Sequence, residues 1–137
     1  MKEIQAYLTF NGDCREAMNF YASALGAELT VVTFGETDPK TAPADRNKVM
    51  HARLARGATI LMASDSVPAA PVRAADSVSL SIVCESDKEV DTLFAGLSAG
   101  GKPTVPPNDA FWGARFAMLT DRYGFHWMLN HERPKKG

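Results

Sequence analysis

The sequence contains one strand-then-helix plan written twice, and this repeat limits the possible folds more than any other feature. A shift of 72 residues places Tyr7 on Ser79, and Leu8 on Leu80. In both windows an alternating strand pattern gives way, at the same place, to a helical stripe at i, i+4, i+7 and i+11. The stripes are Cys14, Met18, Tyr21 and Leu25, and then Ser86, Val90, Leu93 and Leu97.

Each half of the chain continues from its helix into three further strands. The first half is expected to contain strands at 4–10, 27–34, 49–55 and 58–64 and a helix at 14–25. The second half is expected to contain strands at 77–84, 102–105, 115–120 and 125–131 and a helix at 87–98. The sequence therefore predicts an α+β protein: two tandem βαβββ modules that form a curved mixed sheet around a groove, with the helices on the outer face.

We expect the 137 residues to form a single domain. Module one spans 1–66, a linker with Pro68 and Pro71 spans 67–76, and module two spans 77–137. The polar stretch 35–48 is too long for a hairpin turn and is expected to be a mobile loop. Whether that loop is a lid or an inert excursion is left open.

Both helices begin with a capping signal. Asp13 is followed three residues later by Glu16, and Ser86 is followed three residues later by Glu89. Each pair predicts a capping box at the helix N-terminus.

Charge and composition exclude several functions. Fifteen Lys and Arg against 16 Asp and Glu give a net charge of -1, which predicts no nucleic-acid partner. No run approaches the roughly 20 apolar residues of a membrane span, so we expect no membrane partner and a cytoplasmic location. Cys14 and Cys84 lack CxxC partners and are expected to be reduced thiols.

Four segments carry a family resemblance that covers nearly the whole chain. They are YLTFNGDCREAMNFY, MHARLARGATILMASDSVP, SLSIV and FWGARFAMLTDRYGFHWMLN. In this order they resemble the vicinal oxygen chelate superfamily, which includes glyoxalase I, bleomycin and fosfomycin resistance proteins and extradiol dioxygenases. The segments are most similar to its PhnB-like branch, also labelled 3-demethylubiquinone 3-methyltransferase-like. The resemblance implies the glyoxalase/bleomycin resistance fold and a homodimer.

The methyltransferase label does not agree with the first turn. A doubly wound methyltransferase needs a glycine-rich turn after its first strand, and here that strand is followed by Asn11-Gly12-Asp13. We therefore expect no methyl transfer from S-adenosylmethionine.

The resemblance also implies where metal ligands would stand. Metal-using relatives place a His on the first strand of each module and a carboxylate on the last. Those positions are expected to fall here on Gln5, Ser77, Leu61 and Met128. None is an imidazole or a carboxylate, so we expect no metal and no cofactor. A displaced metal site using His51 and His126 remains an alternative.

Polar and aromatic side chains are expected to line the groove on the strand faces turned away from the helices. His51 and Arg53 alternate on one strand and so share a face. Phe111 and Trp112 follow two prolines and are expected to pack against a ligand, the linker or a second subunit. The candidate ligand-binding residues are Gln5, Tyr7, Thr9, His51, Arg53, Ser77, Ser79, Phe111, Trp112, His126 and Asn130.

Three functions remain open on this basis. The first is a metal-free protein that binds a small molecule in its groove. The second is a lyase or other enzyme that uses His51 and His126, either through a displaced metal or with His51 as the candidate catalytic acid or base. The third is a resistance protein that sequesters a drug. The chain contains no GxSxG, P-loop or HExxH pattern.

Overall fold

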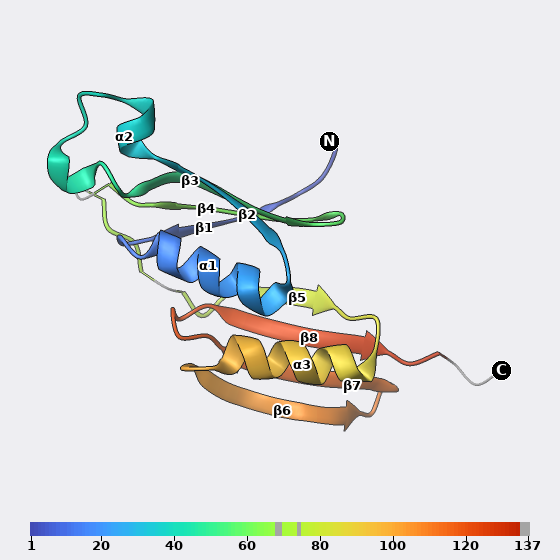
Figure 1. The fold of residues 1–137 in the computed structure, drawn as a ribbon. Helices are drawn as coiled ribbons and strands as arrows, with labels where there is room; N and C mark the ends of the chain where they lie inside the picture. The colour runs from blue at the N-terminus through green and yellow to red at the C-terminus, as the bar shows by residue number, and fades with distance from the viewer. Residues whose placement is uncertain (68–69, 74, 135–137) are drawn as a thin grey trace. The chain divides into compact units, whose positions relative to one another are not determined.

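The computed structural model describes residues 1–67, 70–73 and 75–134. The chain divides into two compact units, Met1–Arg73 and Ala74–Gly137 (Figure 1). Part of the expected linker, including Pro68, lies outside the described residues. Each unit is built around one four-stranded sheet with one long helix.

The first unit follows the expected βαβββ order. It contains β1 (Ala6–Phe10), α1 (Cys14–Leu25), β2 (Glu28–Thr33), α2 (Phe34–Thr37), the 3-10 helix η1 (Pro43–Asp45), β3 (Val49–Arg56) and β4 (Thr59–Asp65). The strand order is β1-β4-β3-β2. β1 runs parallel to β4, and the other neighbours are antiparallel.

The second unit repeats this topology. It contains β5 (Ser79–Val83), α3 (Asp87–Ser98), β6 (Lys102–Ala110), β7 (Ala114–Thr120) and β8 (His126–Glu132). The strand order is β5-β8-β7-β6, and β5 runs parallel to β8. The predicted α+β class and the two tandem βαβββ modules are confirmed, with the strands divided between two four-stranded mixed sheets.

The core of each unit lies between its sheet and its long helix. The stripe of α1 is buried at Cys14, Ala17, Met18 and Tyr21, and α3 buries Val90, Leu93 and Leu97. The facing strand positions are Leu8, Phe10, Ala52, Leu54, Leu61 and Ala63, and then Ala117, Leu119, Trp127 and Leu129. Full burial of each large side chain stabilises the fold by about 1.5–3 kcal/mol. The alternate strand positions form what we call the open face of each sheet.

The N-terminus of α1 is stabilised by a different aspartate from the one expected. The side chain of Asp13 makes no capping hydrogen bond. Instead Asp65, at the end of β4 and only 4% exposed, accepts hydrogen bonds from the backbone N–H groups of Gly12, Cys14 and Val49 at 2.9, 3.0 and 2.8 Å. A carboxylate here also interacts favourably with the helix dipole. The expected Asp13 capping box is therefore wrong.

The cap of α3 agrees more closely with the expectation. Ser86 Oγ accepts a hydrogen bond from the backbone N–H of Glu89 at 3.0 Å, as predicted. The Glu89 carboxylate, however, accepts from the N–H of Glu85 at 3.0 Å instead of from Ser86.

Residues 34–48 carry more structure than the expected mobile loop. Thr33 and Glu36 form a reciprocal capping box at α2. The backbone N–H groups of Phe34 and Gly35 donate to the carbonyls of Lys48 and Arg46, each at 3.0 Å. These bonds join the two ends of the segment 34–48, which we call the 34–48 excursion. A Cβ on Gly35 would approach the carbonyl oxygen of Arg46 to 2.9 Å, so this closure depends on glycine.

Strand β6 extends beyond its expected end at Val105. It continues through Pro106 and Pro107 to Ala110, with register shifts between Pro103 and Val105 and between Val105 and Asn108. β6 is at the edge of its sheet, and among the described strands it pairs with β7 alone. Prolines are tolerated there because their missing N–H is not needed by a second neighbour.

The first strands of the two units begin later than expected. β1 pairs with β4 only from Ala6 onward, and Ile4, expected on the buried face, is 88% exposed beyond the paired part. Likewise Ser77 is an exposed residue before β5. No helix in the described part of the chain has the length and apolar character needed to cross a lipid bilayer.

Candidate functional site

Three of the candidate residues, Tyr7, His51 and Arg53, lie near one another on the open face of the first sheet. Thr30, Arg53, Met62 and Tyr7 are register partners across β2, β3, β4 and β1. His51 lies two residues before Arg53 on β3, opposite Val32. Because side chains alternate along a strand, His51 and Arg53 share this face. We call Tyr7, Thr30, His51, Arg53 and Met62 the first-unit face.

Tyr7 and His51 form a pair on the first-unit face. Tyr7 Oη and His51 Nδ1 lie 3.2 Å apart, and the two ring centroids are 5.8 Å apart. The Tyr7 side chain is 47% exposed, so the pair is accessible. Within the described residues His51 Nε2 has no hydrogen-bond partner. The hydrogen bond orients the imidazole and leaves that second nitrogen available to a ligand.

Arg53 is the cation of the first-unit face. It is exposed, and its guanidinium makes no hydrogen bond or ion pair with any described residue. Arg56, three residues later, donates to the carbonyl of Leu25 at 2.8 Å. Arg53 therefore presents its donors to solvent.

Two further candidate residues of the first unit, Thr9 and Gln5, contribute less to the candidate binding surface. Thr9 lies on the same face at the next β1 position and is partly exposed. Gln5 precedes β1, and its amide donates to Glu3 Oε1 at 2.8 Å. The expectation that Gln5 stands on the strand is wrong, because the paired part of β1 begins one residue later.

The open face of the second sheet contains a histidine held on both sides. Ser79, His126 and Thr120 are register partners. His126 Nδ1 lies 2.8 Å from Thr120 Oγ1, and Nε2 lies 2.9 Å from Asp76 Oδ1. Both ring nitrogens are engaged, so a metal ion at His126 would have to displace one of these partners.

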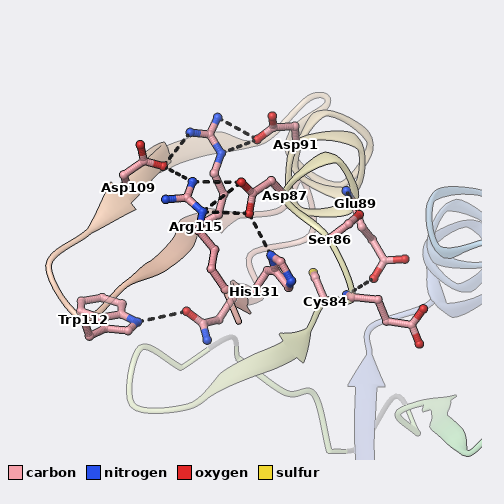
Figure 2. A network of polar contacts seen from close by, with 12 residues as sticks. Cys84, Ser86, Asp87, Glu89, Asp91, Asp109, Trp112, Arg115 and His131 are labelled. Atoms are coloured by element: carbon pink, nitrogen blue, oxygen red, sulfur yellow. Dashed lines mark hydrogen bonds and ion pairs between the residues drawn. The ribbon is translucent and has the colours of Figure 1, made fainter. Parts of the chain in front are cut away.

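Aromatic side chains pack beside β8 on the same open face. Trp112 Nε1 donates to Asn130 Oδ1 at 3.3 Å, a contact drawn in Figure 2. The Trp112 ring makes an edge contact with Phe116 at a centroid distance of 5.2 Å, and Phe111 contacts Trp112 at 5.0 Å. Phe111 itself is 97% exposed. Trp112 therefore packs against the sheet of its own unit, which was not among the expected partners.

The positions expected to correspond to metal ligands do not all lie on the open faces of the two sheets. Gln5 and Ser77 lie outside the strands. Leu61 is 6% exposed on the helix-covered face, while Met128 alternates with the buried Trp127 and lies on an open face. The first hairpin closes at the pair Arg56–Thr59, whereas the second closes at Thr120–His126 across a longer turn. The sequence-based alignment treated the two turns as equal in length, so it was wrong by one residue in the first unit. Because side chains alternate along a strand, this error assigned Leu61 to the open face instead of the buried one.

Across residues 1–67, 70–73 and 75–134, no group of three or more His, Cys, Asp or Glu side chains is arranged to hold a metal ion. His51 lies in the first unit and His126 in the second.

A polar network near the start of α3 was not predicted from the sequence (Figure 2). His131 Nδ1 lies 2.8 Å from Asp87 Oδ1, and Arg133 Nε donates to Asp87 Oδ2 at 3.0 Å. Arg133 also pairs with Asp109, and Arg115 joins Asp109 to Asp91. Hydrogen bonds from Arg133 and then from His131 hold the pKa of Asp87 below its usual range. The alternation of His131 and Arg133 at the end of β8 was the available signal.

Neither cysteine has the properties of a nucleophile. Both thiols are free and buried. Burial is the main cause that raises the pKa of Cys14 to about 12 and that of Cys84 to about 11. Both thiols are therefore protonated at neutral pH, and a protonated thiol is a poor nucleophile.

A family model described as 3-demethylubiquinone-9 3-methyltransferase matches residues 2–130. The chain belongs to this family. Protein YjdN of Escherichia coli (strain K12) is similar, with 30% identity over 93% of this chain and 93% of that protein.

Two solved structures resemble this member of the 3-demethylubiquinone-9 3-methyltransferase family. Protein PA1353 from Pseudomonas aeruginosa is 41% identical with a TM-score of 0.88, covering 98% of this chain and 100% of that one. A putative 3-demethylubiquinone-9 3-methyltransferase, PhnB protein, from Bacillus cereus is 28% identical with a TM-score of 0.73. The match covers 95% of this chain and 99% of that one. The resemblance to the PhnB-like branch of the vicinal oxygen chelate superfamily is confirmed.

A more distant structure agrees in fold alone and confirms the expected glyoxalase/bleomycin resistance fold. A glyoxalase/bleomycin resistance protein/dioxygenase family enzyme from Burkholderia phytofirmans PsJN is 13% identical with a TM-score of 0.67, covering 94% of this chain and 97% of that one.

Proposed function

We propose that this PhnB-like protein binds a small organic molecule on the first-unit face. The observation that carries the proposal is the Tyr7–His51 pair, 3.2 Å apart on an exposed sheet face. A phenol and an imidazole that are already oriented lose little conformational entropy when they bind a ligand. Arg53, free of protein partners among the described residues, supplies a charged group beside them.

Methyl transfer from S-adenosylmethionine has little support in this chain despite the family description. In the part of the chain that the structure describes, each sheet has one parallel pair of strands, β1–β4 in the first and β5–β8 in the second. A doubly wound methyltransferase would bind its cofactor beyond the carboxyl ends of several parallel strands. After β1, the backbone N–H of Gly12 is already bonded to Asp65.

Metal-dependent glyoxalase or dioxygenase chemistry also has little support. Among the described residues no three His, Cys, Asp or Glu side chains are arranged to hold a metal ion. Ile60 and Met62, the open-face neighbours of Leu61, carry an alkyl group and a thioether, which are poor ligands for a divalent metal. The binding proposal therefore needs neither a metal nor a cofactor.

The binding proposal is tested by protein-observed NMR with a library of small aromatic and polar fragments. A compound that binds the first-unit face should shift the amide signals of Tyr7, His51 and Arg53. Tyr7→Phe removes the phenol hydroxyl that orients the imidazole and should weaken binding about three- to tenfold, the equivalent of one hydrogen bond. His126→Gln, on the other sheet, is the matched control and should leave the affinity unchanged. If no fragment shifts this face up to millimolar concentration, the proposal is rejected.

A second candidate is an acid-base enzyme that uses His126. Its support is the contact of His126 Nε2 with Asp76, because a carboxylate that orients an imidazole is common at catalytic bases. In this role the substrate would replace the Thr120 hydroxyl as the partner of Nδ1. Turnover found in an activity screen should then fall at least about 100-fold in His126→Gln. Unchanged turnover in that variant would exclude it.

We also propose that the protein is a homodimer, as the family resemblance implies. Light scattering should then give twice the chain mass of 14.8 kDa. A mass of one chain at micromolar concentration would contradict this.

A further inference from the structure

We propose that the ligand of the first-unit face is a small aromatic carboxylate and that Arg53 binds its carboxylate group. This inference rests on the proposed function, since it names the ligand class of the same face. Its evidence is the charge, the donors and the apolar surface that β1, β2, β3 and β4 place together.

The charge comes from Arg53. Three other arginines of the first unit, in contrast to Arg53, donate to backbone carbonyls: Arg15 to Asn47, Arg46 to Pro39 and Arg56 to Leu25. Arg53 makes no such bond among the described residues, although it lies within a paired strand with neighbours on both sides. An unpaired guanidinium presents a planar fork of N–H donors that matches a carboxylate.

A second donor lies on the same strand face. His51 and Arg53 are two residues apart on β3, so their backbones are separated by roughly 7 Å. When the Tyr7 hydroxyl donates to Nδ1, the neutral imidazole carries its proton on Nε2. His51 then presents an N–H donor beside the guanidinium of Arg53.

An apolar and aromatic surface extends from Arg53 toward β1. Met62 lies between Arg53 and Tyr7 in one register row, and the backbones of the two outer residues are about 10 Å apart, or two strand spacings. A thioether and a half-exposed phenol ring make favourable contacts with an aromatic ring. A ring over Met62 and Tyr7 would therefore place its carboxylate at Arg53.

One acidic residue on the same face opposes anion binding. Glu28 pairs with Ala55, two residues along from the pair of Thr30 and Arg53. It makes no ion pair with Arg53 among the described residues. Its negative charge should lower the affinity for a carboxylate, so its removal should strengthen binding.

The test uses benzoate as the probe, at constant ionic strength and with amide shifts and calorimetry as readouts. Benzamide is the neutral ligand of the same shape. Benzoate should shift the amides of the first-unit face and bind at least about fivefold more tightly than benzamide. Arg53→Gln should lower the affinity for benzoate at least tenfold, and Arg53→Lys should lower it by a smaller factor. Glu28→Gln should raise the affinity for benzoate about twofold. Arg73→Gln, which removes a charge from an exposed residue outside the sheet, should change nothing.

The possible failures are distinguishable. If benzamide binds the same face as tightly as benzoate, the proposed function stands and the carboxylate inference is overturned. Equal losses in Arg53→Gln and Arg73→Gln would mean that net charge, not this site, attracts the anion, and would also overturn the inference. If neither benzoate nor benzamide shifts the first-unit face but another fragment of the library does, the inference is overturned and the proposed function stands. If no fragment shifts this face, both fail. Unchanged melting temperatures of the variants exclude misfolding as the cause of a loss.

Discussion

The carboxylate of Asp65, at the end of β4, accepts a hydrogen bond at 3.0 Å from the backbone N–H of Cys14, the first residue of α1. The same side chain accepts from Gly12 and Val49, so one buried carboxylate joins the helix start to two strands. This contact links the last strand of the unit to its first turn and helps to hold the sheet against α1.

Asp65→Ala should destabilise the protein by at least about 3 kcal/mol, because three backbone N–H groups lose a charged acceptor in a buried site. Urea unfolding measures the loss. Asp13→Ala is the matched control, and it should cost less than about 0.5 kcal/mol because the Asp13 side chain makes no capping bond. A larger loss in Asp13→Ala than in Asp65→Ala would contradict the assignment of the cap.

Both cysteines should react slowly with a thiol reagent in the native protein at pH 8. Burial raises the pKa of Cys14 to about 12 and that of Cys84 to about 11, so little thiolate is present at that pH. Unfolding in urea should speed the labelling of both. Because the pKa of each thiol is higher in the folded state than in the unfolded state, burial of the protonated thiols contributes to the free energy of unfolding. This contribution is fully present below the unfolded thiol pKa and is lost as pH rises toward 11–12. Rapid native labelling at pH 8 would show that the thiols are accessible.

Arg133→Gln should raise the pKa of the Asp87 carboxyl toward its ordinary value. The hydrogen bond from Arg133 is the largest cause of the lowered pKa of Asp87, and it also lowers that of Asp109. These contributions to stability are present above the unfolded carboxyl pKa and are lost as pH falls through the folded value. Carbon-13 NMR titration of the side-chain carboxyls measures the shift. Lys88→Gln, an equal charge change on an exposed residue beside Asp87, should have a much smaller effect, and equal effects would point to net charge.

Gly35→Ala should loosen the base of the 34–48 excursion. The new Cβ would meet the carbonyl oxygen and Cβ of Arg46 at 2.9 and 3.0 Å, so the backbone must move, at a cost of about 1–3 kcal/mol. Hydrogen exchange should quicken at the amides of Phe34 and Gly35, which donate to Lys48 and Arg46. Exchange that stays unchanged at both amides would show that the close approach is readily relieved.

The repeated hydrophobic pattern was enough to predict both long helices. The expected ranges 14–25 and 87–98 agree with Cys14–Leu25 and Asp87–Ser98. Such agreement follows because burial against a sheet selects one stripe of each helix and leaves a periodic signal. For the same reason, strand alternation correctly placed His51 and Arg53 on one face.

Strand register across the hairpins was not predictable from local signals. The sequence contains two similar glycine turns, but the paired residues that close them are Arg56–Thr59 in one and Thr120–His126 in the other. Side chains alternate with period two, so a shift of one residue moved Leu61 from the expected open face to the buried one. The extension of β6 through two prolines likewise depended on its place at the sheet edge.

The sequence by itself determined the βαβββ order, its repetition and the faces of most strands, because these depend on patterns within a few residues. The tertiary structure alone decided which polar groups meet. Tyr7 and His51 are 44 residues apart in the chain, and Asp65 is 51 residues from Cys14. Each pair comes together only because β4 lies between β1 and β3 in the sheet. Such contacts depend on strand pairing between distant segments, and local periodicity contains no record of that pairing.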